Sequence, residues 1–184
     1  MPHATGRWTA ELVRAMPDDG NRYELIEGQL LVTPAPRGLH QVAVRELMRR
    51  LDPWVSATPG VDLLFSPADL SLGEDELLQP DLFVYRTAAG TQLRDWSDIT
   101  ALLVVVEVLS PSTARYDRQL KRRRYQRAGV PEYWIVDLDA RVVERWRPAD
   151  ARPEVVTDHL VWRPDGEAAL TIDVAAYFTS VCGV

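Results

Sequence analysis

The chain has 184 residues, enough to bury a sizeable hydrophobic core, and we predict a single domain over residues 1–184. Its hydrophobic fraction of 46% and charged fraction of 26% are typical of soluble globular proteins. The single cysteine, Cys182, excludes an internal disulfide and a cysteine-rich zinc site, and it fits the reducing cytoplasm, our predicted location. There is neither a signal-peptide core nor an apolar run long enough to span a bilayer, so we expect no membrane association.

The charge pattern gives a mixed indication about nucleic acid. A net charge of -6 argues against indiscriminate coating of nucleic acid. Residues 115–127, however, carry seven basic residues and one acid, Asp117. This basic run is either a solvated helix face or a phosphate-binding stripe that includes Arg118 and Arg122.

The first half of the chain alternates helical and extended patterns. A short helix is predicted over residues 9–16, with Thr9 as its cap. Two apolar runs around Glu27-Gly28 predict a hairpin, and residues 39–54 have the spacing of an amphipathic helix. Two further extended segments follow, residues 61–72 with a break at Ser66-Pro67, and the apolar run 77–85.

The centre of the chain predicts a strand, a helix and a second strand. Residues 101–109 form a short apolar run rich in β-branched residues, typical of a strand covered on both faces. A helix is predicted over residues 115–128, capped by Ser110 or Thr113 and ended by Gly129. The strand that starts at Tyr133 should lie parallel to the first. Residues 141–146 predict an antiparallel neighbour, and the remainder predicts short strands near 155–162 and 170–174 and a terminal segment over 175–178.

Two acids and a lysine stand out against this apolar background. Glu107 lies inside the predicted central strand, and Asp81 lies in the apolar run 77–85. A carboxylate in such a place must be paired, hydrogen-bonded, protonated or bound to metal. Lys121 is the only lysine among the 21 basic residues. It is either half of an exposed pair with Asp117 or a residue that leans towards the sheet, on a helix face shared with the core candidates Tyr125 and Ala128.

The pattern of reactive side chains favours a hard cation over other chemistries. The three histidines are scattered, which argues against a histidine-rich zinc site. Neither a nucleophile elbow nor a glycine-rich phosphate loop is present. Two carboxylates that meet at the end of a sheet suit magnesium, which can hold a phosphate and lower the pKa of a water molecule.

The segment Pro80-Asp81, followed by Glu107 and then Lys121, resembles the PD-(D/E)xK signature of restriction-endonuclease-like nucleases. The usual signature has its lysine two residues after the second acid, where this chain has Leu109, so Lys121 would be a lysine that has moved to the following helix. A wider set of segments resembles a bacterial family of restriction-endonuclease-like proteins: residues 23–28, 79–81, 107–113 and 129–137.

This resemblance implies an α/β fold with a restriction-endonuclease-like core, a mixed β-sheet flanked by helices. It also implies a metal-dependent endonuclease that hydrolyses phosphodiester bonds, with DNA as its partner. Asp81 and Glu107 would hold Mg²⁺ or Mn²⁺, Lys121 would be catalytic, and Glu24 becomes a candidate third acid. A homodimer would agree with this function, since cutting both strands requires two sites.

Plainer interpretations remain for each residue. Asp81 could simply begin a strand, Glu107 could be a satisfied core acid, and Glu24 could lie on the surface of the hairpin. His40 is expected on the helix surface, with a substrate contact as the lesser alternative. At the level of function, the alternatives are a catalytically silent nucleic-acid-binding module and a protein-interaction domain on the same fold.

Overall fold

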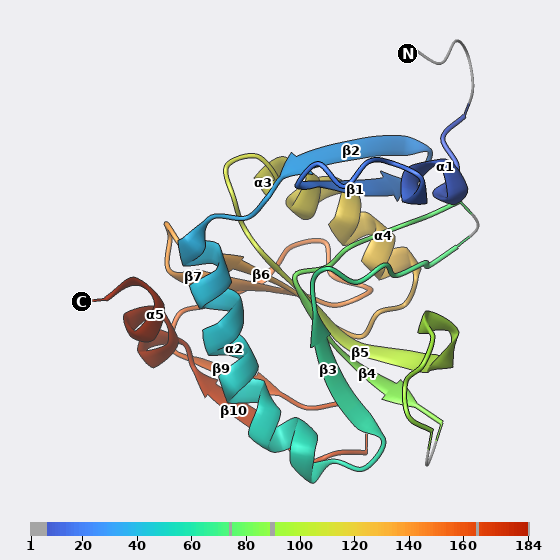
Figure 1. Ribbon diagram of the computed structural model, residues 1–184. Coiled ribbons are helices and arrows are strands. Elements are labelled where there is room, and N and C mark those ends of the chain that lie inside the picture. Colours follow the sequence, from blue (N-terminus) through green and yellow to red (C-terminus); the bar gives the residue numbers. More distant parts are fainter. Residues whose placement is uncertain (1–6, 74, 89–90, 165, 184) are drawn as a thin grey trace.

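A six-stranded mixed sheet forms the centre of the molecule, in the order β3-β4-β5-β6-β7-β8 (Figure 1). The computed structural model describes residues 7–73, 75–88, 91–164 and 166–183. The strands are β3 Val61–Phe65, β4 Leu82–Thr87, β5 Ile99–Val108, β6 Tyr133–Asp137, β7 Val142–Trp146 and β8 Glu154–Val156. The α/β fold class predicted from the sequence is confirmed.

The one parallel pair among the described neighbours of this sheet is β5–β6, as the sequence predicted. The other neighbouring pairs, β3–β4, β4–β5, β6–β7 and β7–β8, are antiparallel. A helical crossover links β5 to β6 and comprises α3 (Ala114–Tyr116), the π-helical turn η2 (Asp117–Lys121) and α4 (Arg122–Arg127). Gly129 ends this crossover at a φ of 72°, the left-handed conformation that glycine adopts without strain.

Different elements cover the two faces of the sheet (Figure 1). One face packs against α2 (Gly38–Ala57), α5 (Val174–Cys182) and the small hairpin of β9 (His159–Trp162) and β10 (Leu170–Asp173). The other packs against the crossover and the hairpin of β1 (Asn21–Ile26) and β2 (Gln29–Pro34). Because side chains alternate along a strand, Val104 and Val106 point to the first face and Val105 to the second. Glu107 therefore belongs to the second face, together with the hairpin and the crossover.

The local elements at the N-terminal end follow the sequence pattern. Helix α1 (Ala10–Arg14) has Thr9 as its cap, and the Thr9 hydroxyl accepts a hydrogen bond from the Leu12 amide at 3.3 Å. The turn of the β1–β2 hairpin is Glu27-Gly28, and both residues have positive φ, as tight hairpin turns require. The 3₁₀ helix η1 (Trp96–Asp98) precedes β5. No helix of the described residues could cross a membrane.

Three predictions about element boundaries were wrong. The run 77–85 is not one strand: Leu77 and Leu78 form isolated bridges to Leu25 and Leu70, and β4 begins only at Leu82. The predicted single helix 115–128 is divided by a π-helical turn, and Ala128 is exposed. The terminal segment is longer than predicted, because α5 runs to Cys182.

Candidate active site

Asp81 and Glu107 face each other across the first residues of the β4–β5 ladder. Leu82 pairs with Val106, and one step further along this antiparallel register places Asp81 opposite Glu107. The carboxylate of Asp81 also accepts a hydrogen bond from the Val108 amide at 2.8 Å. Both acids are buried, yet both line one cavity of about 490 Å³ at this end of the sheet. The structure therefore brings together the two acids that the sequence singled out.

Two cationic or donor side chains hold the Asp81 carboxylate. Arg22 of β1 lies 2.9 Å from Oδ1, and Nε2 of His40, in the first turn of α2, lies 2.9 Å from Oδ2. Burial opposes ionisation of Asp81, but the His40 hydrogen bond and the Arg22 charge outweigh it and keep the pKa below its usual value. Asp81 is therefore ionised at neutral pH, and Nε2 of His40 is the donor. The expectation that His40 lies on the helix surface was wrong, because it is buried against Asp81.

Lys121 occupies the interior, at the end of the π-helical turn. Its Nζ lies 3.0 Å from Oε1 of Glu107, 3.0 Å from Oε2 of Glu24 and 3.5 Å from Oδ1 of Asp117. Only 1% of its surface is exposed, so the alternative of an exposed pair with Asp117 was wrong. Burial lowers the pKa of Lys121, but Glu107, Glu24 and Asp117 outweigh this effect and raise it well above the usual value. The ammonium is thus permanently charged, and it does not reach the described walls of the cavity.

Glu24 joins the β1–β2 hairpin to this cluster. Its Oε1 accepts a hydrogen bond from the Gln79 amide at 2.8 Å, two residues before Asp81, while its Oε2 pairs with Lys121. Glu24 is 1% exposed, so the interpretation of it as a surface residue of the hairpin was wrong. The hairpin consequently contributes two charged side chains to the buried cluster, the carboxylate of Glu24 and the guanidinium of Arg22.

The cluster contains more carboxyl groups than permanent cations. Four carboxyl groups, those of Glu24, Asp81, Glu107 and Asp117, face two permanent cations, Arg22 and Lys121. Burial, together with the neighbouring acids, raises the pKa of Glu107 well above its usual value despite the nearby Lys121. Burial likewise raises the pKa of Asp117 to about 6. A bound cation would therefore relieve unfavourable charge.

The two arginines predicted to bind nucleic acid are engaged within the protein. Arg118 lines the cavity, but its guanidinium pairs with Asp137 and Glu144, both at 2.6 Å. Arg122 hydrogen-bonds to the Gln126 side chain at 2.7 Å and lies over the Trp146 ring at 4.5 Å from its centroid. It does not line the cavity among the described residues. Arg118 and Arg122 are thus not simply solvated, because each already has partners within the protein.

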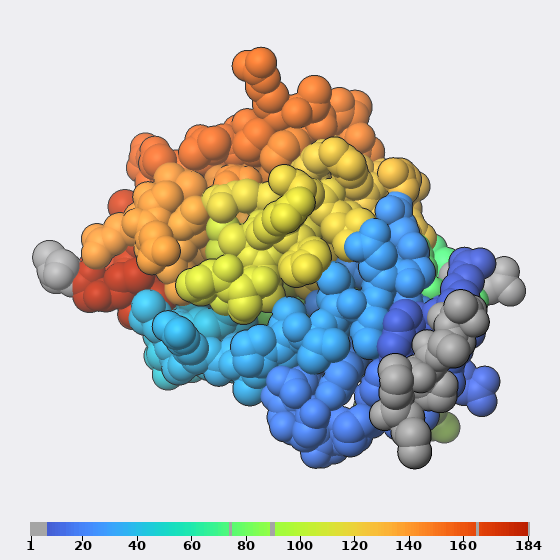
Figure 2. Space-filling model, turned by 90° about the horizontal axis from the view of Figure 1, so that it is seen from above, coloured from blue at the N-terminus to red at the C-terminus, as the bar shows by residue number. Residues whose placement is uncertain are grey.

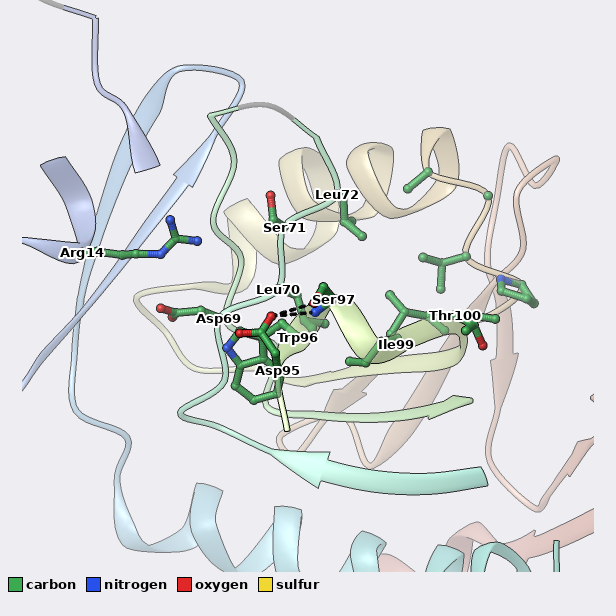
Figure 3. A pocket seen from close by; sticks show the side chains of 16 residues that line it. Arg14, Asp69, Leu70, Ser71, Leu72, Asp95, Trp96, Ser97, Ile99 and Thr100 are labelled. Atoms are coloured by element: carbon green, nitrogen blue, oxygen red, sulfur yellow. Dashed lines mark hydrogen bonds between the residues drawn. The ribbon is translucent and has the colours of Figure 1, made fainter. Parts of the chain in front are cut away.

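A larger cavity lies at the opposite end of β5 and contains none of the predicted site residues (Figure 3). Its volume is about 790 Å³, and Leu70, Trp96 and Ile99 form part of its walls. One of its acids, Asp95, is used locally, since its carboxylate accepts hydrogen bonds from the amide and hydroxyl of Ser97. The buried ionisable groups therefore mark the smaller cavity as the candidate active site.

Comparisons with known proteins show the family of the chain and its fold. A family model described as "Putative restriction endonuclease", Uma2, matches residues 10–176. The chain belongs to the Uma2 family. A crystal structure described as that of "a putative nuclease belonging to DUF820" from Anabaena variabilis ATCC 29413 has a TM-score of 0.74 to this Uma2 protein, with 22% sequence identity. The alignment covers 94% of this chain and 98% of that chain, and it shows a shared fold. No curated protein matches.

The resemblance drawn from the sequence is thereby confirmed, and a nuclease-like assignment is supported at the level of the family. Sequence reasoning missed Arg22 and misjudged His40, although each left a signal. Arg22 and Glu24 are opposite charges two residues apart, on one side of an apolar hairpin strand. His40 continues the spacing of the buried α2 residues Val44, Leu47 and Leu51.

The donor set of this Uma2 site fits a hard divalent cation in chemistry and charge. Carboxylate oxygens are the ligands that Mg²⁺ prefers, and Mg²⁺ usually keeps several waters and takes only one or two protein carboxylates. Among the described residues, no group of three or more His, Cys, Asp or Glu could hold a metal ion by itself. Asp81 and Glu107 would thus be the two protein ligands, with Asp81 exchanging contacts that it now makes with Arg22 and His40.

Proposed function

We propose that this protein is a metal-dependent endonuclease that hydrolyses phosphodiester bonds of DNA. The observation that carries the proposal is the buried pair Asp81–Glu107, which faces a cavity and has excess negative charge behind it. This arrangement occurs in a chain of the Uma2 family, which is described as "Putative restriction endonuclease". The excess negative charge supports binding of Mg²⁺ or Mn²⁺ by these two carboxyl groups.

Each residue of the cluster has a distinct role in this proposal. Asp81 and Glu107 would hold the cation, which when bound would supply Lewis-acid stabilisation of the phosphate and lower the pKa of a water molecule. Lys121 orients the Glu107 carboxyl group, since its ammonium lies 3.0 Å from Oε1, and its charge partly offsets the burial that raises the pKa of Glu107. Glu24 holds Lys121 from the hairpin side. In the reaction, water adds across a P–O bond, and the departing oxygen takes up a proton.

The test is cleavage of supercoiled plasmid, linear duplex, single-stranded DNA and RNA with Mg²⁺, with Mn²⁺ and with EDTA. Asp81→Asn should abolish cleavage, and because it also removes the ion pair with Arg22, cleavage should be measured well below the melting temperature of the variant. Glu46→Gln is the matched control, because Glu46 is also a buried acid but is paired with Arg45, Arg49 and Arg50 on α2. Cleavage that persists in EDTA, or in Asp81→Asn, would refute the proposal.

One observation favours a second candidate, the catalytically silent nucleic-acid-binding module. Both oxygens of Asp81 are already engaged, by Arg22 on one side and by His40 and the Val108 amide on the other. If these contacts are never exchanged, no cation can bind. Binding of nucleic acid without cleavage under any metal condition would select this candidate.

A further inference from the structure

Tyr116 is an exposed aromatic ring beside the entrance to the crossover. It is 40% exposed, although it is followed directly by the buried turn that carries Lys121. It lines a shallow pocket of about 340 Å³ together with Gln29, Arg115, Gln119, Leu120 and Arg123. An aromatic ring that is not buried and has arginines around it is typical of a surface on which nucleic-acid bases stack.

The arginines of this pocket differ from the others on the crossover. Arg118 pairs with Asp137 and Glu144, Arg124 with Glu76, and Arg127 with Glu27. Arg115 and Arg123 are exposed and make no ion pair with the residues that the structure describes. Arg122 makes no ion pair among the described residues either, but it is partly buried over the Trp146 ring, so the exposed and unpaired positive charge of the crossover lies around Tyr116.

This pocket and the candidate cavity are both lined by the first turn of the crossover. Ala114 lines the cavity, and the next two residues, Arg115 and Tyr116, line the shallow pocket. In Figure 2, the yellow crossover lies beside the blue β1–β2 hairpin, with the start of α2 next to them. A flexible strand bound at Tyr116 would pass around this helical turn to reach Asp81 and Glu107.

The depth of the catalytic acids restricts which nucleic acid can reach them. Asp81 is 3% exposed and Glu107 1% exposed, so a phosphodiester must enter the cavity to contact them. An unpaired strand is more flexible than an intact duplex and can bend one phosphodiester into this cavity of about 490 Å³ more readily. The net charge of -6 also provides little general attraction for duplex DNA.

We propose that Tyr116, Arg115 and Arg123 form a binding site for unpaired nucleic acid. One base stacks on Tyr116, the two arginines contact the flanking phosphates, and the strand leads into the cavity. The preferred substrate is accordingly single-stranded, or the unpaired end of a duplex. The cleavage part of this inference rests on the proposed function, but the binding part does not.

The experiment measures binding by fluorescence anisotropy in EDTA, so that no cleavage occurs. The probe is a fluorescein-labelled oligodeoxynucleotide of about 15 nucleotides, used single-stranded and as a blunt duplex, a length that covers the site sizes of single-strand-binding folds. We expect the single strand to bind about tenfold more tightly than the duplex. Tyr116→Ala should weaken single-strand binding by about tenfold, whereas Tyr116→Phe, which keeps the ring, should bind as well as the wild type.

The charged half of the site has its own variant and control. Arg115→Ala combined with Arg123→Ala should weaken binding and reduce the steepness of its salt dependence. Arg127→Ala is the matched control, since it removes an exposed arginine of the same crossover that is paired with Glu27. It should leave both quantities unchanged.

The outcomes separate this inference from the proposed function. Equal binding of duplex and single strand, or unchanged binding in Tyr116→Ala, would overturn the inference even if plasmid were cut. Tight single-strand binding that depends on Tyr116, without cleavage in Mg²⁺ or Mn²⁺, would support the inference and refute the proposed function. Absence of any nucleic-acid binding would refute the inference and would favour a protein-interaction domain.

Discussion

The ammonium of Lys121 lies 3.0 Å from the carboxylate of Glu107 inside the molecule, although the two residues are 14 positions apart and belong to a helical turn and a strand. The contact comes from the π-helical turn, in which Asp117 and Lys121 are the two buried residues. Such turns are frequent at functional sites. The position two residues after Glu107 is held by Leu109, which lines the cavity. Lys121 is not among the described residues that line the cavity, so its ammonium contacts Glu107 from the protein interior and not from the cavity.

Lys121→Arg tests whether this contact needs an ammonium. The planar guanidinium is larger and cannot fit among three carboxyl groups in the same way, so we expect cleavage to fall by about a hundredfold or more. Because Lys121 is fully buried, overpacking should also lower the free energy of unfolding by about 1–3 kcal/mol. Cleavage should be measured well below the melting temperatures of both proteins.

The control for this substitution is Arg124→Lys, which also keeps the charge and lies three residues further along the crossover. Arg124 pairs with Glu76 away from the candidate site, so the rate should stay near that of the wild type. A folded Lys121→Arg variant that cuts as fast as the wild type would exclude a specific role for the ammonium.

Glu107→Gln tests metal binding directly. The glutamine keeps the shape of the side chain but is a poor ligand for a hard cation, so affinity for Mn²⁺ in titration calorimetry should fall by at least about tenfold. Thermal stability without metal should change little, because burial already raises the pKa of Glu107 and favours its neutral form. Wild-type affinity for Mn²⁺ in the variant would remove Glu107 from the metal site.

Most of the fold could be predicted from local sequence signals. The parallel pair β5–β6 follows from two apolar runs joined by a helical segment, and the β1–β2 hairpin follows from its Glu27-Gly28 turn. The start of β4 could not be predicted, because residues 77 and 78 are as apolar as a strand. They are buried through isolated bridges to the hairpin and to Leu70, which are contacts between distant parts of the chain.

The candidate site was predictable in part. Asp81, Glu107 and Lys121 are conspicuous because they are charged residues in apolar surroundings or rare in the composition. His40 and Glu24 were misplaced because a polar residue on an amphipathic helix or a hairpin usually faces water, and only the tertiary fold provides their partners. The π-helical turn has no known sequence signal in this chain.

Arg22→Gln tests whether a cation can take the place of Arg22 at Asp81. Removing Arg22 leaves the buried Asp81 without its ion pair, and we expect a loss of about 3–5 kcal/mol in the free energy of unfolding. A divalent cation that binds Asp81 should recover part of this loss. Mg²⁺ or Mn²⁺ should thus raise the melting temperature of Arg22→Gln more than that of the wild type.

The matched control for Arg22→Gln is Arg127→Gln, whose arginine is exposed and pairs with Glu27. It should cost little stability and should not change the response to metal. If metal stabilises Arg22→Gln no more than the wild type, the proposed exchange at Asp81 is wrong.

Asp117→Asn tests the excess of acid in the buried cluster through the pH dependence of stability. Burial raises the pKa of Asp117 to about 6, so between about pH 4 and 6 the folded protein binds more protons than the unfolded chain. The contribution of Asp117 to stability therefore falls as the pH rises through this window, by up to about 3 kcal/mol at 1.36 kcal/mol per pKa unit. Neither carboxylate oxygen has a hydrogen-bond partner among the described residues, so Asp117→Asn breaks no hydrogen bond, although it removes the ion pair with Lys121.

Urea denaturation from pH 4.5 to 8 should consequently show Asp117→Asn to be more stable than the wild type above pH 6, with the difference shrinking towards pH 4.5. Asp137→Asn should have the opposite effect on the free energy of unfolding. Hydrogen bonds and Arg118 keep the pKa of Asp137 below its usual value despite partial burial. Loss of the Asp137 carboxylate should destabilise the protein at neutral pH, and this destabilisation should diminish as the pH falls. Parallel stability curves for Asp117→Asn and the wild type would show that the charge of Lys121 already balances that of Asp117. Excess negative charge in the cluster would then give no reason to expect a bound cation.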